Sequence, residues 1–175
     1  MPEFRHETLR LVLRDWREAD WPVFWEATNT PAVMRWLGGV ADEGTRAAAQ
    51  ARVEGYRADH GHTFWVVERK EDGALLGFCG LKRSNQPGGP QGMMEVGWRL
   101  REDAWGQGYA KEAASAALDL AFDRFGADEV IALTVHPVPS SKLPSKARAV
   151  PLRNSNNSSN ERHEETGRWQ LEDAR

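Results

Sequence analysis

The sequence predicts one domain of mixed α/β (α+β) class, because strand-like alternating segments are interleaved with helix-like apolar stripes. Its 175 residues fall within the usual size of a single domain. Two β-rich runs flank the turn Glu71-Asp72-Gly73, which is typical of an antiparallel hairpin. An alanine-rich stripe that follows Tyr109 indicates a long amphipathic helix.

The N-terminal part predicts one strand and three helices. Leucines at every second position over residues 9–14 indicate a strand with one buried face. Asp20 and Thr30 each precede a helix-entry proline and predict two short helices. Asp42 can cap a third helix, which should end near Gly61, since glycine readily takes the left-handed closing conformation.

The central part predicts three strands, a helix and a further strand. Residues 63–70 and 75–81 are the two strands of the hairpin. Residues 94–100 alternate between an apolar face and a mixed polar face. A helix over 109–126 and a strand over 129–135 follow.

Beyond Val135 the pattern changes, because four prolines and the Asn/Ser tract 154–160 interrupt any regular element. We therefore expect a packed domain over 1–135 and an atypical, poorly ordered tail over 136–175. No strand is predicted in this tail, so strand 129–135 should be an exposed edge that invites a homodimer. A shifted reading frame, an added tail and true divergence would all produce this pattern.

Composition argues against nucleic acid, an anionic membrane and a metal ion as partners of this protein. The net charge of −3 and the pI near 6.0 give no basic field for nucleic acid or an anionic membrane. The lone Cys79 permits no intramolecular disulfide and no cysteine zinc site, which favours a cytoplasmic location. His60 and His62 look like loop residues, and they lack an identifiable third ligand, so no metal is expected.

The most informative segment runs from Trp105 to Ala113 as Trp-Gly-Gln-Gly-Tyr-Ala-Lys-Glu-Ala. Glycines at a helix entrance expose backbone N–H groups at the positive end of the helix dipole, where a phosphate can bind. The segment lacks the Gly-Lys-Ser/Thr of a Walker motif and the context of a dinucleotide fingerprint. The alternative is purely structural: a tight turn that allows close helix packing.

With its surroundings, the string from Glu95 to Ala113 resembles the acetyl-CoA motif of the GNAT N-acetyltransferases, Arg/Gln-x-x-Gly-x-Gly/Ala. Trp105 departs from the first position, although a Trp-Gly pair there looks like the RimJ/RimL branch, as does segment 29–37. The resemblance spans residues 7–135 and implies a twisted, mostly antiparallel sheet flanked by helices. It further implies acetyl-CoA as cosubstrate, held by the backbone of Gly106, Gln107, Gly108, Tyr109, Ala110 and Lys111, with an amide among Trp98, Arg99 and Leu100 polarising the thioester carbonyl.

Acetyl transfer to a primary amine needs a neutral nitrogen, so a general base is useful. Glu95 precedes Gly108 by a spacing similar to that of the catalytic glutamate in histone-acetylating members, and it lies off the strand's apolar face. The alternatives are an exposed strand carboxylate or a salt bridge to Arg99. Four tryptophans at 16, 21, 25 and 36 are either core residues or a lining of the acceptor cleft.

The resemblance fails at the general acid, because neither Tyr56 nor Tyr109 stands where the family places the tyrosine that protonates the leaving thiolate. Slow rather than absent acetyl transfer is therefore expected.

Two alternative functions remain open. The first is a GNAT-like module that binds an acyl-CoA and transfers little, and the second is an unrelated phosphate-binding protein. A protein N-terminus, a polyamine, an antibiotic or an amino acid would all serve as acceptor.

Overall fold

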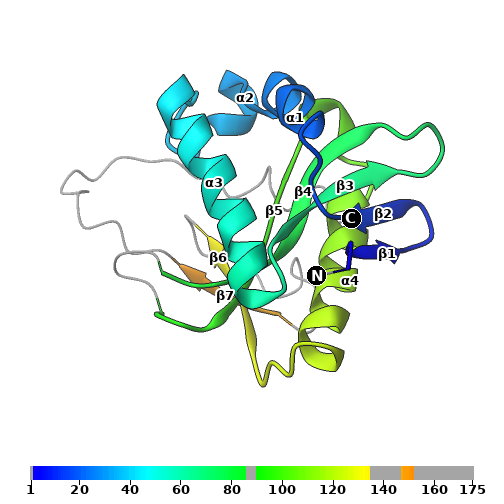
Figure 1. Cartoon of the computed structure of the whole chain (residues 1–175), viewed down its shortest axis with the longest axis vertical. Coiled ribbons are helices and arrows are strands. Elements are labelled where there is room, and N and C mark those ends of the chain that lie inside the picture. The colour runs from blue at the N-terminus through cyan, green and yellow to red at the C-terminus, as the bar shows by residue number, and fades with distance from the viewer. Residues whose placement is uncertain (1, 86–89, 135–146, 152–175) are drawn as a thin grey trace.

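The computed structural model describes residues 2–85, 90–134 and 147–151, and it confirms a mixed α/β fold built on a mostly antiparallel sheet (Figure 1). Within these ranges seven strands lie side by side in chain order. They are β1 (Arg5–Glu7), β2 (Leu11–Arg14), β3 (Phe64–Arg69), β4 (Leu75–Arg83), β5 (Met94–Leu100), β6 (Val130–Thr134) and β7 (Ala147–Pro151). The pairings from β1 to β5 are antiparallel, whereas β5–β6 and β6–β7 are parallel.

Helices cover both faces of the sheet. They are α1 (Asp20–Thr28), α2 (Pro31–Met34), α3 (Glu43–His60) and α4 (Tyr109–Asp123), with the short turn η1 (Glu102–Ala104) before α4. Figure 1 shows α3 in front of the sheet and α4 behind it. The alanines of α4 pack against Trp65 and Cys79 in the larger core, while α1 packs against Val66 and Phe78 from the opposite face.

Local sequence signals set most helix ends as predicted. The Thr30 hydroxyl accepts a hydrogen bond from Val33 N at 3.2 Å, and the Asp42 carboxylate accepts one from Thr45 N at 2.8 Å. Gly61 ends α3 with φ at 72°. Asp20 differs from the expectation, because it lies inside α1 and its carboxylate binds Arg14 instead of capping the helix.

The predicted hairpin is confirmed, since β3 and β4 pair antiparallel around a turn in which Gly73 has φ of 71°. The first predicted strand is only partly right. Strand β2 begins at Leu11 and not at Leu9, because Leu9 lies in the turn between β1 and β2 and is 88% exposed. Strand β1 itself was missed, since Arg5–Glu7 carries no apolar alternation.

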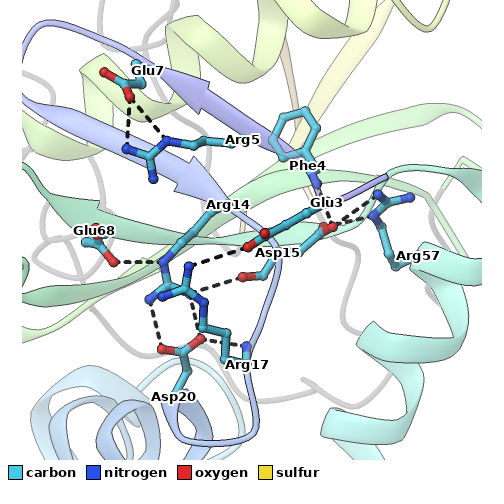
Figure 2. Close-up of polar contacts among 10 residues, drawn as sticks. All are labelled: Glu3, Phe4, Arg5, Glu7, Arg14, Asp15, Arg17, Asp20, Arg57 and Glu68. Atoms are coloured by element: carbon cyan, nitrogen blue, oxygen red, sulfur yellow. Dashed lines mark hydrogen bonds and ion pairs between the residues drawn. The ribbon is translucent and has the colours of Figure 1, made fainter. Parts of the chain in front are cut away.

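Figure 2 shows an ion cluster that links β2, α1 and β3, in which Arg14 and Asp20 are buried. The Arg14 guanidinium donates to both Asp20 oxygens, at 2.7 and 2.9 Å, and its Nε donates to Glu68 at 2.7 Å. Only 4% of Arg14 is exposed. The cluster therefore joins α1 to strands β2 and β3.

The expectation of no strand after Val135 is wrong, because β7 pairs in parallel along the whole of β6. Strand β6 is thus not a sheet edge. An open strand edge offers unpaired N–H and C=O groups, so a short segment can pair with it without a long apolar pattern of its own. Residues 136–146 and 152–175, which the tail prediction also covers, lie outside the described residues.

Candidate functional site

The entrance of α4 is an amide-lined turn. Gly106 and Gly108 have φ values of 72° and 78°, a conformation that favours glycine. The first hydrogen bond of the helix runs from Glu112 N to Gly108 O at 3.1 Å, so the N–H groups of Tyr109, Ala110 and Lys111 have no acceptor within the helix. A Cβ built on Gly106 meets nothing within 4 Å, so the turn opens outward. These features fit an anion such as a pyrophosphate.

A polar network ties this turn to the β1–β2 connection. One Glu112 oxygen accepts hydrogen bonds from the Thr8 hydroxyl at 2.5 Å and from Arg10 N at 2.7 Å, and the other accepts from Arg10 Nε at 2.7 Å. Arg10 Nη1 also donates to Gln107 O at 2.9 Å, and the guanidinium lies 4.4 Å from the Tyr109 ring centre. Thr8, Arg10 and Glu112 were missed because no local pattern links them.

This network should fix the shape of the turn. We expect Arg10→Met to weaken acetyl-CoA binding about fivefold, equivalent to roughly 1 kcal/mol, since the turn loses its bond to Gln107 O and one charged partner of Glu112. Isothermal titration measures the effect. Arg5→Met is the control, because the exposed Arg5 pairs with Glu7 and not with α4. Equal affinity of Arg10→Met and the parent would show that the network does not shape the turn.

Strands β5 and β6 pair only at the start of β5. Their parallel pairing joins Met94 to Val130 and Glu95 to Ile131, and it ends there, although β5 continues to Leu100. Arg101 N donates to Leu76 O on β4 at 2.8 Å. Successive amides of a strand point alternately to its two neighbours, so the Arg99 amide, like that of Arg101, points to β4. The amides of Trp98 and Leu100 point the other way, to the side on which β6 no longer pairs with β5.

Glu95 lies where the strand pairing ends. Its side chain is 9% exposed, and Lys82 Nζ on β4 approaches Oε2 at 3.5 Å. That oxygen is buried and accepts no hydrogen bond from the residues that the structure describes. Burial raises the pKa of Glu95, and the attraction of Lys82 offsets this only in part. A buried carboxylate with a raised pKa is suited to accept a proton.

Both structural alternatives for Glu95 are wrong. The carboxylate is buried rather than exposed, and its ion pair is with Lys82 instead of Arg99. Residues four apart on a strand share a face but lie about 13 Å apart, whereas Lys82 is directly opposite Glu95 on the neighbouring strand. Lys82 was missed because cross-strand register cannot be read from local sequence.

The other candidates are mostly structural. Trp21 is buried and stacks on Trp16 with ring centres 3.8 Å apart, while Trp25 is half-buried beside Arg99. His60 is the last residue of α3 and so is not a loop residue, whereas His62 lies in the connection between α3 and β3, as expected, and is buried with Nδ1 3.0 Å from Leu81 O. Among the described residues there is no cluster of three metal-ligating side chains and no helix long and apolar enough to span a membrane.

Comparison with known proteins assigns the fold to a family. Residues 10–140 match the model of the acetyltransferase (GNAT) domain. The chain is 30% identical over 143 residues to the uncharacterized N-acetyltransferase YnaD of Bacillus subtilis, covering 79% of this chain and 78% of that protein. It is 36% identical to the uncharacterized protein YkkB of the same organism over 99 residues, which is 54% of each chain, so it matches about half the length of that relative.

Solved structures agree with this family. An acetyltransferase from Agrobacterium tumefaciens superposes with a TM-score of 0.62 at 28% identity, over 74% of this chain and 72% of that one. The fold is shared with spermidine N-acetyltransferase from Vibrio cholerae, solved in complex with CoA and spermine, at a TM-score of 0.55 and 18% identity over 70% of each chain. The chain therefore belongs to the GNAT acetyltransferase family.

Proposed function

We propose that the protein transfers the acetyl group of acetyl-CoA to a primary amine, as a RimJ/RimL-like N-acetyltransferase of the cytoplasm. The observation that carries this proposal is the parting of β5 and β6 at the buried Glu95, in a chain that also has an amide-lined turn at the start of α4. Beyond Glu95 no residue of β5 pairs with the described part of β6, and members of the family use acetyl-CoA as cosubstrate.

Binding would begin at the turn. The amides of Gly106 to Lys111 and the dipole of the 15-residue α4 attract the pyrophosphate. The pantetheine arm then lies in the gap between β5 and β6, where an amide of Trp98 or Leu100 donates to the carbonyl oxygen. Acetyl-CoA supplies the activated thioester, and the protein orients it and stabilises the negative charge on its carbonyl oxygen.

Glu95 would act on the acceptor. An amine is mostly an ammonium at neutral pH and cannot attack without losing a proton. Glu95 accepts that proton, directly or through one water, the nitrogen forms the C–N bond as the C–S bond breaks, and the nitrogen then releases its remaining extra proton to water to give the amide. No tyrosine occupies the family's acid position, so water protonates the thiolate, and a thiol pKa of about 8.5 makes this leaving group tolerable.

The turn can be tested directly. Gly108→Val should weaken acetyl-CoA binding at least tenfold, about 1.4 kcal/mol, because valine is strained at φ 78° and its side chain would disturb the first amides of α4. Titration calorimetry gives the affinity, and circular dichroism shows whether the variant is folded. Gly55→Ala is the control, since Gly55 lies within α3 and a Cβ there meets nothing within 4 Å. A folded Gly108→Val protein with parental affinity would remove the turn from the site.

A further inference from the structure

A second charged residue lies on the same face of β5 as Glu95. Arg99 is directly opposite Phe78 of β4 and points toward α1 and α2. Its guanidinium carbon lies 4.5 Å from the ring centre of Phe24, 5.1 Å from that of Trp25 and 5.4 Å from that of Phe78. Nη1 lies 3.0 Å from the Met34 sulfur. Three aromatic rings and a thioether therefore surround the cation.

Arg99 has no carboxylate partner in the part of the chain that the structure describes. No ion pair within 4.0 Å involves it, and its buried Nε donates no hydrogen bond. Arg14, which is fully buried while Arg99 is half-buried, pairs with two carboxylates. Burial lowers the pKa of Arg99 to about 10, so the side chain stays charged at neutral pH. A desolvated cation without an anion is costly, and such groups cluster where a ligand provides the missing charge.

Arg99 lies near the groups that are proposed to bind the thioester and to deprotonate the amine. Its neighbours Trp98 and Leu100 direct their amides to the gap that would hold the thioester. Glu95 lies on the same face, about 13 Å away along the strand. An acceptor whose amine approaches the thioester from this face would pass between Glu95 and Arg99. Cation–π contacts hold the guanidinium in place and Nη1 donates to the Met34 sulfur, a weak acceptor, while the buried Nε has no acceptor among the described residues.

We propose that the acceptor of this enzyme carries a carboxylate on the same molecule as its primary amine, and that Arg99 binds this carboxylate while Glu95 faces the amine. This inference rests on the proposed acetyl transfer and specifies its substrate class as amino acids whose amine and carboxylate are far enough apart to reach both Glu95 and Arg99, which lie about 13 Å apart along the strand. A polyamine offers only cations, which Arg99 would repel. The planar guanidinium fork fits a carboxylate through two parallel hydrogen bonds, which explains why an arginine suits this position better than a lysine.

The test uses pairs of acceptors that differ only in charge. Glycine, β-alanine, 4-aminobutyrate and 5-aminopentanoate are each compared with their carboxamides, and spermidine is added as a polycation. Rates are compared at equal concentrations of neutral amine, since amidation also lowers the amine pKa. We expect at least one acid to exceed its amide tenfold or more in kcat/KM, and Arg99→Met to reduce that ratio to near one, mainly through KM. Arg99→Lys should restore part of the ratio, and Arg52→Met, at an exposed position of α3, should leave it unchanged.

Several outcomes would overturn the inference. Spermidine or the amides could be the better acceptors of the parent, or the acid-to-amide ratio could survive Arg99→Met. If no amine at all is acetylated, the proposed function fails, and carboxylate binding is then measured as thermal stabilisation by each acid in the presence of CoA. Stabilisation that Arg99→Met abolishes and Arg52→Met retains would support the carboxylate site on its own. No stabilisation of the parent by any of the acids would refute it.

Discussion

Replacing Glu95 with glutamine should lower kcat about a hundredfold at pH 7, the range that loss of a general base produces. Glutamine keeps the size of the side chain and removes its proton affinity. The loss should shrink as the pH approaches about 10, because a primary amine then deprotonates without help. Titration of acetyl-CoA should give the parental affinity, since Glu95 is not part of the turn before α4.

The pH profile separates catalysis from packing. In the parent, kcat/KM should fall on the acid side as Glu95 is protonated, at a pH above the ordinary glutamate pKa because burial raises it. The Glu95→Gln profile should lack this step. Glu43→Gln, at an exposed position in the first turn of α3, serves as the control and should keep it. An unchanged profile in Glu95→Gln would exclude this carboxylate from proton transfer.

The largest effect on stability is expected at Asp20. Asp20→Ala leaves the buried Arg14 with Glu68 as its only carboxylate and should reduce the free energy of unfolding by about 3 kcal/mol, the low end for a broken buried pair. For a chain of this length that corresponds to a fall in melting temperature of roughly 6–12 °C. Calorimetry measures it, with Glu7→Ala, in the exposed pair with Arg5, as the control that should melt like the parent.

The same pair should contribute to acid sensitivity. Burial raises the pKa of Asp20, but hydrogen bonds from Arg14 and Arg17 N outweigh burial and hold the pKa below its usual value. A carboxyl group whose pKa is depressed on folding stabilises the protein above its unfolded pKa of about 3.9, and this contribution is lost as the pH falls through the folded pKa. Below pH 4 the parent and Asp20→Ala should therefore converge in stability. A constant difference down to pH 2 would contradict this assignment.

Sequence predicted the elements whose signals are local. Asp42 and Gly61 bound α3 because capping depends on a few neighbouring backbone groups, and Gly73 closes the β3–β4 hairpin for the same reason. Strands β1 and β7 were missed, since a short strand is stabilised by the edge it joins rather than by its own pattern.

The site was predictable only in part, because its residues meet through long-range contacts. The turn at Gly106 to Lys111 could be read from its glycines and the helix that follows. The bond from Arg10 N to Glu112 joins residues 102 positions apart, and no periodicity reveals it. The residues opposite Glu95 and Arg99, which are Lys82 and Phe78, depend on the register between β4 and β5, and the further contacts of Arg99 come from α1 and α2.

The central claim, acetyl transfer to an amine, is tested most directly by following release of the CoA thiol from acetyl-CoA while mass spectrometry identifies the acceptor. The acceptors are peptides with free N-termini, amino acids, an aminoglycoside and spermidine. The proposal predicts slow thiol release that requires the amine, together with one acetylated nitrogen on at least one acceptor. Binding of acetyl-CoA without acetylation of any acceptor would contradict it and identify the protein as a module that binds acyl-CoA.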